Sequence, residues 1–154
     1  MLRLSKKADY ALIAMKHLAL RGDHGSQAST SAREIAELYD IPIELMAKVL
    51  QRLVRRGLLA SQQGTRGGYQ LARMPALISV ADVIQAIDGP VTVTACSTDE
   101  GHQCEQYSKC NVRDPLWRVR ERILTALDEC TIAELAADPP IPAPARAAVL
   151  HTHL

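Results

Sequence analysis

Apolar residues recur three and four positions apart in three stretches near the beginning of the chain, and this spacing predicts three helices. The first helix is expected over 5–20, with Ser5 as its cap. The second is expected to begin at Ser31, because Ser31 and Glu34 have the spacing of a capping box. The third is expected over 42–57, where a proline opens the helix and a glycine closes it.

The third of these helices has an apolar face and a basic face. The apolar face carries Leu45, Met46, Val49, Leu50 and Leu53. The basic face carries Lys48, Arg52, Arg55 and Arg56. Because these basic residues are spaced i, i+4, i+7 and i+8, they gather along one side of the helix.

A short β-hairpin is expected directly after the third helix. Residues 58–61 and 69–72 have strand-like composition and flank a turn that holds three glycines and Arg66. Three helices followed by a basic hairpin are the order of a winged helix-turn-helix, so we predict a mainly α fold with a small hairpin wing. The third helix can then enter the major groove of DNA, while Arg66 contacts the DNA backbone or the minor groove. The alternative is a small packing module with a solvated basic face.

The second half of the chain predicts a fourth helix over 79–89 and a long helix beginning at Asp114 and Pro115. Apolar residues spaced three and four apart form a narrow seam along the long helix: Leu116, Val119, Ile123, Ala126 and Cys130. We expect the seams of two chains to pack together in a homodimer. The alternative is that the seam packs against its own domain.

The pattern therefore divides the chain into four regions. These are a winged helix-turn-helix DNA-binding domain over 1–90, a cysteine loop over 91–113, a dimerisation helix over 114–137 and a flexible proline-rich tail over 138–154.

Charge adds an asymmetry that the net value of +1 conceals. Residues 1–75 hold 12 Lys and Arg against 6 Asp and Glu, whereas residues 76–154 hold 6 against 11. A basic first half favours an anionic partner such as nucleic acid, although a solvated surface with uneven charge explains it equally well. No apolar run reaches the roughly 18–20 residues that span a bilayer, and no signal peptide is recognisable. We therefore expect a cytoplasmic protein without membrane contact.

Three of the four cysteines lie close together in a polar loop: Cys96, Cys104 and Cys110. In the cytoplasm such clusters bind metal more often than they form disulfides. Gaps of seven and five residues are wider than the short knuckles of structural zinc sites and suit an iron–sulfur cluster, while zinc and redox-active thiols stay open. Since His102 lies in the same loop as the thiols, no positioned Cys–His–Asp set indicates an enzyme.

Several motifs taken together resemble the iron–sulfur transcription regulators of the IscR, NsrR and RirA type. They are the opening MLRLSKKADYAL, the wing GTRGGYQLAR, the helix SVADVIQAIDGPV, the three cysteines and the long helix that follows, together covering about residues 1–135. The resemblance implies a homodimer that binds a double-stranded DNA operator through its winged helices. It also implies that Cys96, Cys104 and Cys110 hold a cluster that signals iron, oxygen, nitric oxide or redox state.

The resemblance further implies the type of cluster and its fourth ligand. The IscR type supplies a histidine three residues after the third cysteine, where this chain has Arg113. The cysteine spacing is more similar to the NsrR and RirA branch, which implies a [4Fe-4S] cluster, with [2Fe-2S] as the alternative. In NsrR an aspartate in the first helix of the partner subunit is a ligand, and Asp9 occupies the matching place.

The function that this implies is a regulator, expected to be a repressor, of iron–sulfur assembly, iron or redox and nitrosative stress genes. The opening is most similar to regulators of the SUF operon. Ala47 stands where the IscR type has a glutamate that filters DNA sequences, so the resemblance does not extend to the operator. A zinc-dependent or thiol-redox regulator without a cluster is the alternative.

Overall fold

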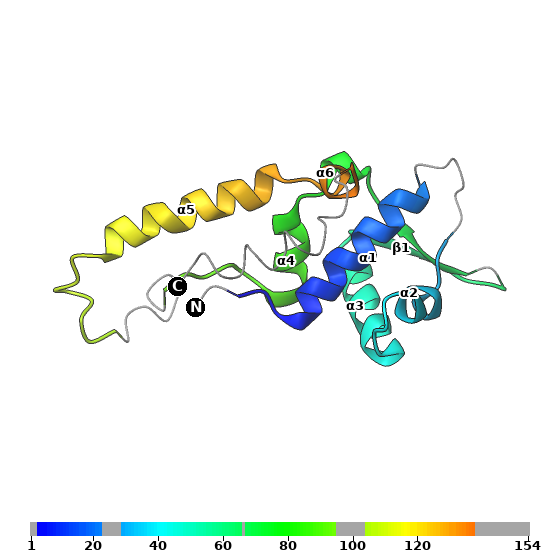
Figure 1. Ribbon diagram of the computed structural model, residues 1–154. Helices are drawn as coiled ribbons and strands as arrows, with labels where there is room; N and C mark the ends of the chain where they lie inside the picture. Colours follow the sequence, from blue (N-terminus) through cyan, green and yellow to red (C-terminus); the bar gives the residue numbers. More distant parts are fainter. Residues whose placement is uncertain (1–2, 23–28, 66, 95–103, 138–154) are drawn as a thin grey trace, which may run out of the picture.

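The computed structural model describes residues 3–22, 29–65, 67–94 and 104–137 of the 154-residue chain. Its elements are α1 (Lys6–Gly22), α2 (Ala32–Leu38), α3 (Ile43–Arg55), β1 (Leu59–Gln62), β2 (Gly68–Leu71), the 3₁₀ helix η1 (Pro75–Leu77), α4 (Val80–Asp88), α5 (Arg113–Glu129) and α6 (Ile132–Ala137). The prediction of a mainly helical fold with a small antiparallel hairpin is confirmed (Figure 1).

The helix starts are set by side chains that accept hydrogen bonds from first-turn amides, which have no partner inside a helix. Ser5 Oγ accepts a bond of 3.1 Å from an amide of the first turn of α1. Ser31 Oγ accepts from the Glu34 amide at 3.2 Å, and the Glu34 carboxylate accepts from the Ser31 amide at 2.7 Å. Ser79 and Asp82 form the same capping box at α4. All three predicted caps are present.

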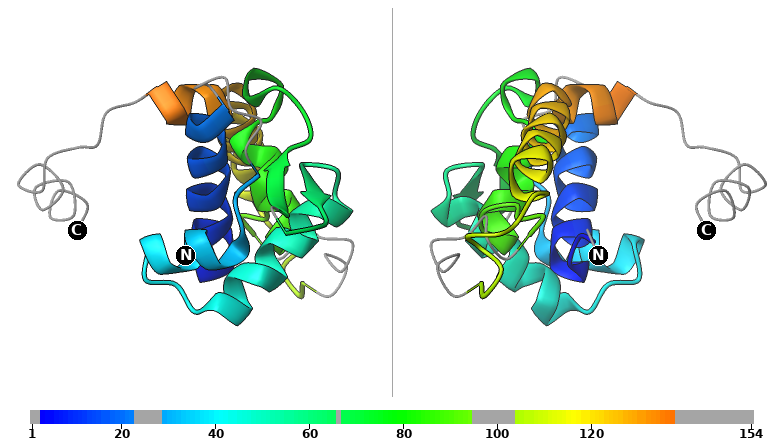
Figure 2. Two further views of the ribbon diagram at one scale, coloured as in Figure 1. Left: turned by 90° about the vertical axis from the view of Figure 1, so that its right-hand side faces the viewer. Right: turned by 90° about the vertical axis from the view of Figure 1, so that its left-hand side faces the viewer.

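The core is aliphatic and is built around α1, which carries small residues on its buried face. Ala8, Ala11 and Ala14 are completely buried, and their short side chains let neighbouring helices approach α1 closely. The larger buried side chains facing them include Met15, Ile35, Met46, Leu50 and Leu53. Figure 2 shows α1 as the central helix of the body, with the other elements arranged around it.

A histidine–tyrosine contact joins α1 to the end of α2. His17 Nδ1 lies 3.1 Å from the Tyr39 hydroxyl, and the two rings meet edge to face at a centroid distance of 5.6 Å. Partial burial, and next the positive charge of Arg21, lower the pKa of His17 below its usual value. The imidazole therefore favours its neutral form in the folded protein.

The wing is tied to the start of α2 by a backbone bridge. β1 and β2 pair antiparallel, with Leu59 opposite Leu71. Thr30 pairs with Tyr69 through two backbone hydrogen bonds of 3.0 and 2.8 Å. A Cβ at Gly68 would lie 2.7 Å from the carbonyl carbon and oxygen of Thr30, so only glycine permits this approach without displacement. The bridge therefore fixes the wing against the helix-turn-helix.

The range 114–137, expected as one dimerisation helix, contains two helices. The chain breaks at Cys130 and Thr131, where Thr131 and Glu134 form a further capping pair with bonds of 2.8 and 3.2 Å. Ile132 of α6 is completely buried in the core, and its amide donates to Ile78 O at 2.9 Å. In contrast, α5 has no buried residue and extends away from the body (Figure 1). Thus α6 belongs to the N-terminal core, whereas α5 contacts the body on one side only and carries no fully buried residue.

Among the described residues, no helix is long and apolar enough to cross a membrane.

Candidate nucleic-acid interface and cysteine region

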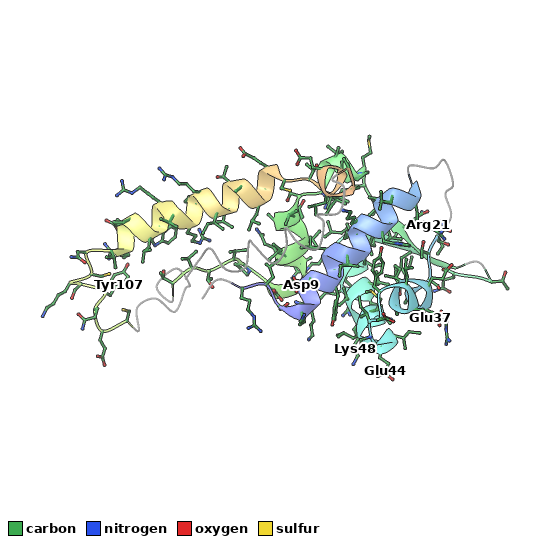
Figure 3. All side chains as sticks on the ribbon, in the orientation of Figure 1. Asp9, Arg21, Glu37, Glu44, Lys48 and Tyr107 are labelled. Atoms are coloured by element: carbon green, nitrogen blue, oxygen red, sulfur yellow. The ribbon has the colours of Figure 1, made fainter. Side chains whose placement is uncertain are left out.

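The polar side chains of α3 lie on two sides of the helix, one that continues into the wing and one that faces α4. Glu44, Lys48, Gln51 and Arg55 follow one another at i, i+4, i+7 and i+11, which aligns them in a stripe along one face of the helix. We call these four residues the α3 stripe. Figure 3 shows Glu44 and Lys48 at the free end of α3, directed away from the body. The stripe is thus open at the end where a recognition helix contacts base edges.

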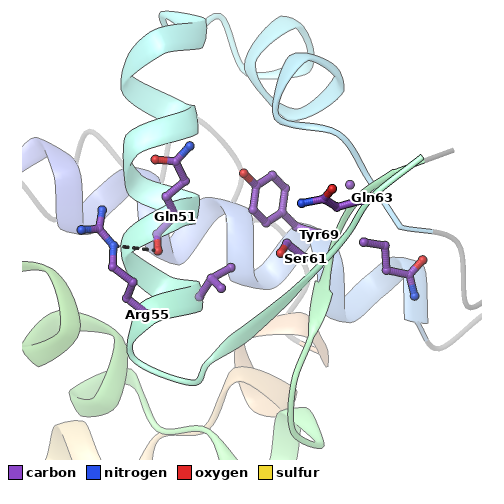
Figure 4. Close-up of a pocket in the computed structure, with 8 residues that line it drawn as sticks. Gln51, Arg55, Ser61, Gln63 and Tyr69 are labelled. Atoms are coloured by element: carbon purple, nitrogen blue, oxygen red, sulfur yellow. Dashed lines mark hydrogen bonds between the residues drawn. The ribbon is translucent and has the colours of Figure 1, made fainter. Parts of the chain in front are cut away.

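The other end of the α3 stripe borders a groove of about 680 Å³ between α3 and the wing. Gln51 and Arg55 line it from the helix, and Ser61, Gln63 and Tyr69 line it from the hairpin (Figure 4). Arg55 Nε also donates to Gln51 O, at 3.5 Å. The α3 stripe and the wing therefore form one continuous surface.

Arg52 and Arg56 are directed toward α4 instead. Arg52 Nε donates to Ala86 O at 2.8 Å, a bond between α3 and α4. Arg56 lines a second cavity, of about 290 Å³, together with Arg73 and residues of α4. The four basic residues predicted as one face thus lie on two faces, with Lys48 and Arg55 on the α3 stripe and the other two beside α4.

The sequence did not point to several residues of this surface, among them Gln51 and Tyr69. Gln51 falls in the same helical register as Lys48 and Arg55, which is the signal that could have identified it. Tyr69 faces α3 only because the hairpin folds back over the helix, and no local pattern indicates this. Arg66, the predicted wing contact, lies outside the described residues, so its role stays a prediction.

Hydrogen bonds from three elements converge on the end of α4 and the segment that follows it. Besides the bond from Arg52, Ser5 Oγ donates to the Asp88 carboxylate at 2.6 Å, and Arg120 Nε of α5 donates to Val91 O at 3.3 Å. The start of α1, the recognition helix and α5 are therefore all attached to the stretch of chain that leads into the cysteine loop.

Cys104 and Cys110 lie in the loop at the far end of α5. Cys104 is exposed and Cys110 half-buried, and two turns separate them, closed by Tyr107 N–H to Cys104 O and Lys109 N–H to Gln106 O, both at 3.0 Å. The loop places both thiols close to solvent, at the end of α5 that points away from the core.

Arg113, which stands where the IscR type has a histidine ligand, joins the end of this loop to the start of α5. Its guanidinium lies 4.7 Å from the centre of the Tyr107 ring and donates to Tyr107 O at 3.4 Å and to the Asp114 carboxylate at 3.1 Å. The hydrogen bond and then the charge of Asp114 raise the pKa of Arg113 further, so it stays a cation close to Cys110. A guanidinium has no lone pair available for a metal.

The structure does not bring the four predicted cluster ligands together within the part of the chain that it describes. Cys96 lies outside this part, and no group of three metal-binding side chains occurs in it. Asp9 lies half-buried in the first turn of α1, within the body, whereas Tyr107 marks the cysteine loop at the far end of α5 (Figure 3). Asp9 and the described cysteines of one chain are therefore at separate places in the molecule.

The predicted seam of α5 is partly covered and partly open. Leu116 and Ile123 are half-buried on the side of Arg120, whereas Val119 is 44% exposed and Ala126 is exposed. Cys130 ends the helix and its carbonyl accepts a 2.8 Å bond from the Val80 amide. An apolar strip along α5 is thus left uncovered within one chain.

The family model described as Rrf2, iron-dependent transcriptional regulator, matches residues 4–138 of the chain. The chain belongs to the Rrf2 family. The transcriptional regulator IscR of Yersinia pseudotuberculosis is 36% identical to this Rrf2 chain over 135 residues, which cover 87% of the chain and 79% of that relative. The resemblance inferred from the motifs is confirmed.

Solved structures agree with this assignment. The global cysteine regulator CymR of B. subtilis superposes with a TM-score of 0.71 at 28% identity, covering 91% of this chain and 100% of CymR. IscR of T. potens superposes with a TM-score of 0.65 at 28% identity, covering 87% of this chain and 85% of that one. These relatives are transcriptional regulators, so this Rrf2 protein is a DNA-binding regulator and not an enzyme.

Proposed function

We propose that this Rrf2 protein is a cytoplasmic homodimeric regulator whose DNA binding responds to an iron–sulfur cluster, held by Cys96, Cys104, Cys110 and Asp9 of the partner subunit. We expect it to act as a repressor of iron–sulfur assembly, iron or redox and nitrosative stress genes. The observation that carries the proposal is the placement of two solvent-accessible thiols on a loop away from the core, in a family described as iron-dependent.

The α3 stripe and the wing groove support contact with double-stranded DNA. Lys48 and Arg55 are exposed on the side of α3 that continues into the wing, so one duplex can meet both elements. Arg66, which lies outside the described residues, is proposed to extend this contact from the tip of the wing.

The donor set fits a cluster better than it fits a hard metal ion. Thiolates prefer soft metals such as iron in iron–sulfur clusters, and the positive charge of Arg113 offsets part of the negative charge of a thiolate site. A bound cluster would supply redox chemistry that no side chain provides. We propose [4Fe-4S], with [2Fe-2S] as the alternative.

The separation of Asp9 from the cysteine loop supports a ligand shared between subunits. The 17 residues of α5 extend over about 25 Å, which holds the loop away from the body that contains Asp9. A second chain can bring its own α1 to this loop. The exposed Val119 and Ala126 offer α5 as the contact between the two chains.

The cluster is tested by measuring iron, acid-labile sulfide and the absorption spectrum of protein purified without oxygen. We expect about four iron and four sulfide per chain, because a [4Fe-4S] cluster has this composition. Cys104→Ala and Cys110→Ala should lose the cluster, whereas Cys130→Ala, the matched control, should keep it. Colourless wild-type protein that contains zinc or only free thiols would favour the alternative, a zinc or thiol-redox regulator.

The shared ligand is tested with a mixed dimer of an Asp9→Ala chain and a Cys104→Ala chain. If Asp9 acts across the interface, the mixed dimer contains one complete site, formed by the cysteines of the first chain and Asp9 of the second. We then expect half of the wild-type cluster content, decaying in air at the wild-type rate. If Asp9 serves its own chain, no complete site exists and this slowly decaying fraction is absent.

DNA contact is tested by measuring affinity for an operator fragment against salt concentration. Arg55→Ala should lower the salt slope by about 1 per subunit, hence about 2 in the homodimer, because each lost phosphate contact releases about one counterion fewer. Arg118→Ala, the control, removes the same charge from an exposed position of α5 and should leave the slope unchanged. Equal slopes for both variants would contradict the assignment of this face.

A further inference from the structure

We propose that Glu44 recognises a C·G base pair, accepting a hydrogen bond from the cytosine amino group in the major groove. Glu44 is exposed in the first turn of α3, and its side chain lies beside that of Lys48 at the free end of the α3 stripe (Figure 3). The inference rests on the proposed docking of α3 in the major groove and assigns a base to one residue of that face.

Among the residues that the structure describes, no hydrogen bond or ion pair engages the Glu44 carboxylate. In the described parts of the chain, the ion pairs join Arg33 to Glu37, Arg113 to Asp114 and Arg120 to Glu121, and none includes Glu44. The N-terminal turn of α3 has Pro42 as its cap and no side-chain capping bond. What remains is a modest interaction with the helix dipole, which any acidic residue in the first turn provides.

A carboxylate in this position is unfavourable near DNA unless it meets a donor. The phosphates repel it, and the acceptors of guanine and thymine repel it as well. Two bases present an amino donor in the major groove. The adenine amino group lies beside the N7 acceptor of the same base, whereas the cytosine amino group has no acceptor on its own base edge. Cytosine is therefore the base that a lone carboxylate tolerates best.

Lys48 makes the assignment geometrically consistent. It lies one turn further along the stripe, and its ammonium group can meet a phosphate or a guanine while Glu44 meets the neighbouring edge. The α3 stripe thus presents a hydrogen-bond acceptor, Glu44, followed by a donor, Lys48. The order of the two sets the orientation in which α3 lies along the DNA site.

The test is a selection of binding sequences from a random double-stranded DNA pool with the full-length protein. We expect the wild-type motif to contain a position that requires C·G. In Glu44→Ala, discrimination at that position should fall by roughly 5- to 100-fold, since one good base contact is worth about this much, while other positions keep their preference. Glu44→Gln should shift the same position toward A·T, because an amide bonds adenine at N6 and N7.

The control is Glu129→Gln, which makes the same change in net charge at the exposed end of α5. It should leave every base preference intact. If Glu44→Ala binds all sequences more tightly with an unchanged motif, the carboxylate only repels DNA and the proposal is wrong. If the wild type selects no motif, the docking of α3 fails instead, which separates the two ideas. A helix content equal to wild type confirms that each variant is folded.

Discussion

Replacing Gly68 with alanine tests whether the wing is held against the helix-turn-helix by the Thr30 bridge. The new Cβ would lie 2.7 Å from the Thr30 carbonyl carbon and oxygen and 3.0 Å from the Ser31 amide nitrogen. These are backbone atoms, so no side chain can rotate away to make room. The strand must shift by several tenths of an ångström, which lengthens the bonds of 2.8 and 3.0 Å that join Thr30 to Tyr69.

The expected cost follows from these contacts. Two backbone hydrogen bonds contribute about 1 kcal/mol each, and overpacking adds about 1–3 kcal/mol when it is not fully relieved. We therefore expect Gly68→Ala to lower the free energy of unfolding by about 3–5 kcal/mol, measured by urea denaturation. Affinity for an operator should fall as well, because Tyr69 and the groove beside α3 move with the strand.

The control is Gly22→Ala at the end of α1, where a Cβ meets nothing within 4 Å. Alanine is favoured over glycine in a helix, so this variant should be unchanged or stabilised by up to about 1 kcal/mol. Opposite signs for the two substitutions are the expected result. Equal stability of Gly68→Ala and wild type would show that the wing is not closely packed against Thr30.

Further predictions concern the core, α3 and pH. Ile132→Ala should cost about 2–5 kcal/mol in unfolding free energy because Ile132 is completely buried, whereas Val119→Ala on α5 should cost under about 1 kcal/mol in the monomer. Arg52→Ala should lower stability by about 1 kcal/mol through loss of its bond to α4 and change the salt slope of DNA binding less than Lys48→Ala does. The free energy of unfolding should fall as the pH drops below about 6.5, because the pKa of His17 is lower in the folded protein and the unfolded chain therefore binds the proton more readily. In denaturation curves, His17→Gln should remove this fall.

The sequence predicted best what depends on neighbouring residues. The caps at Ser5, Ser31 and Ser79 are correct because a side-chain cap is an interaction over three residues and needs no tertiary information. The break before α6 carried the same kind of signal, since Thr131 and Glu134 have the spacing of a capping box. From the sequence alone the long helix could continue or bend at 131–137, because apolar residues recur at helical spacing on both sides of this signal.

The sequence does not determine the rotation of each helix about its own axis, and therefore which of its sides a neighbouring element covers. Helical spacing gathers Lys48, Arg52, Arg55 and Arg56 on one broad side of α3, but it cannot say where α4 covers that side. Only the packed structure directs Arg52 to a carbonyl of α4, places Arg55 beside the wing and leaves Lys48 exposed at the free end of the stripe. The cysteines show the same limit, because the distance from Asp9 to the loop depends on α5 leaving the body.

The orientation of α3 about its own axis has a measurable consequence for DNA binding. If all four basic residues of α3 contacted phosphates, they would contribute a salt slope of about 3.6 per subunit, since each contact adds about 0.9. If Arg52 and Arg56 stay beside α4 in the complex, the contribution of Lys48 and Arg55 alone is about 1.8. The difference is doubled in a homodimer, so it is large enough to measure. A protein with fewer phosphate contacts on its recognition helix has a weaker electrostatic, sequence-independent affinity, and a larger share of its operator binding must come from base contacts along the α3 stripe.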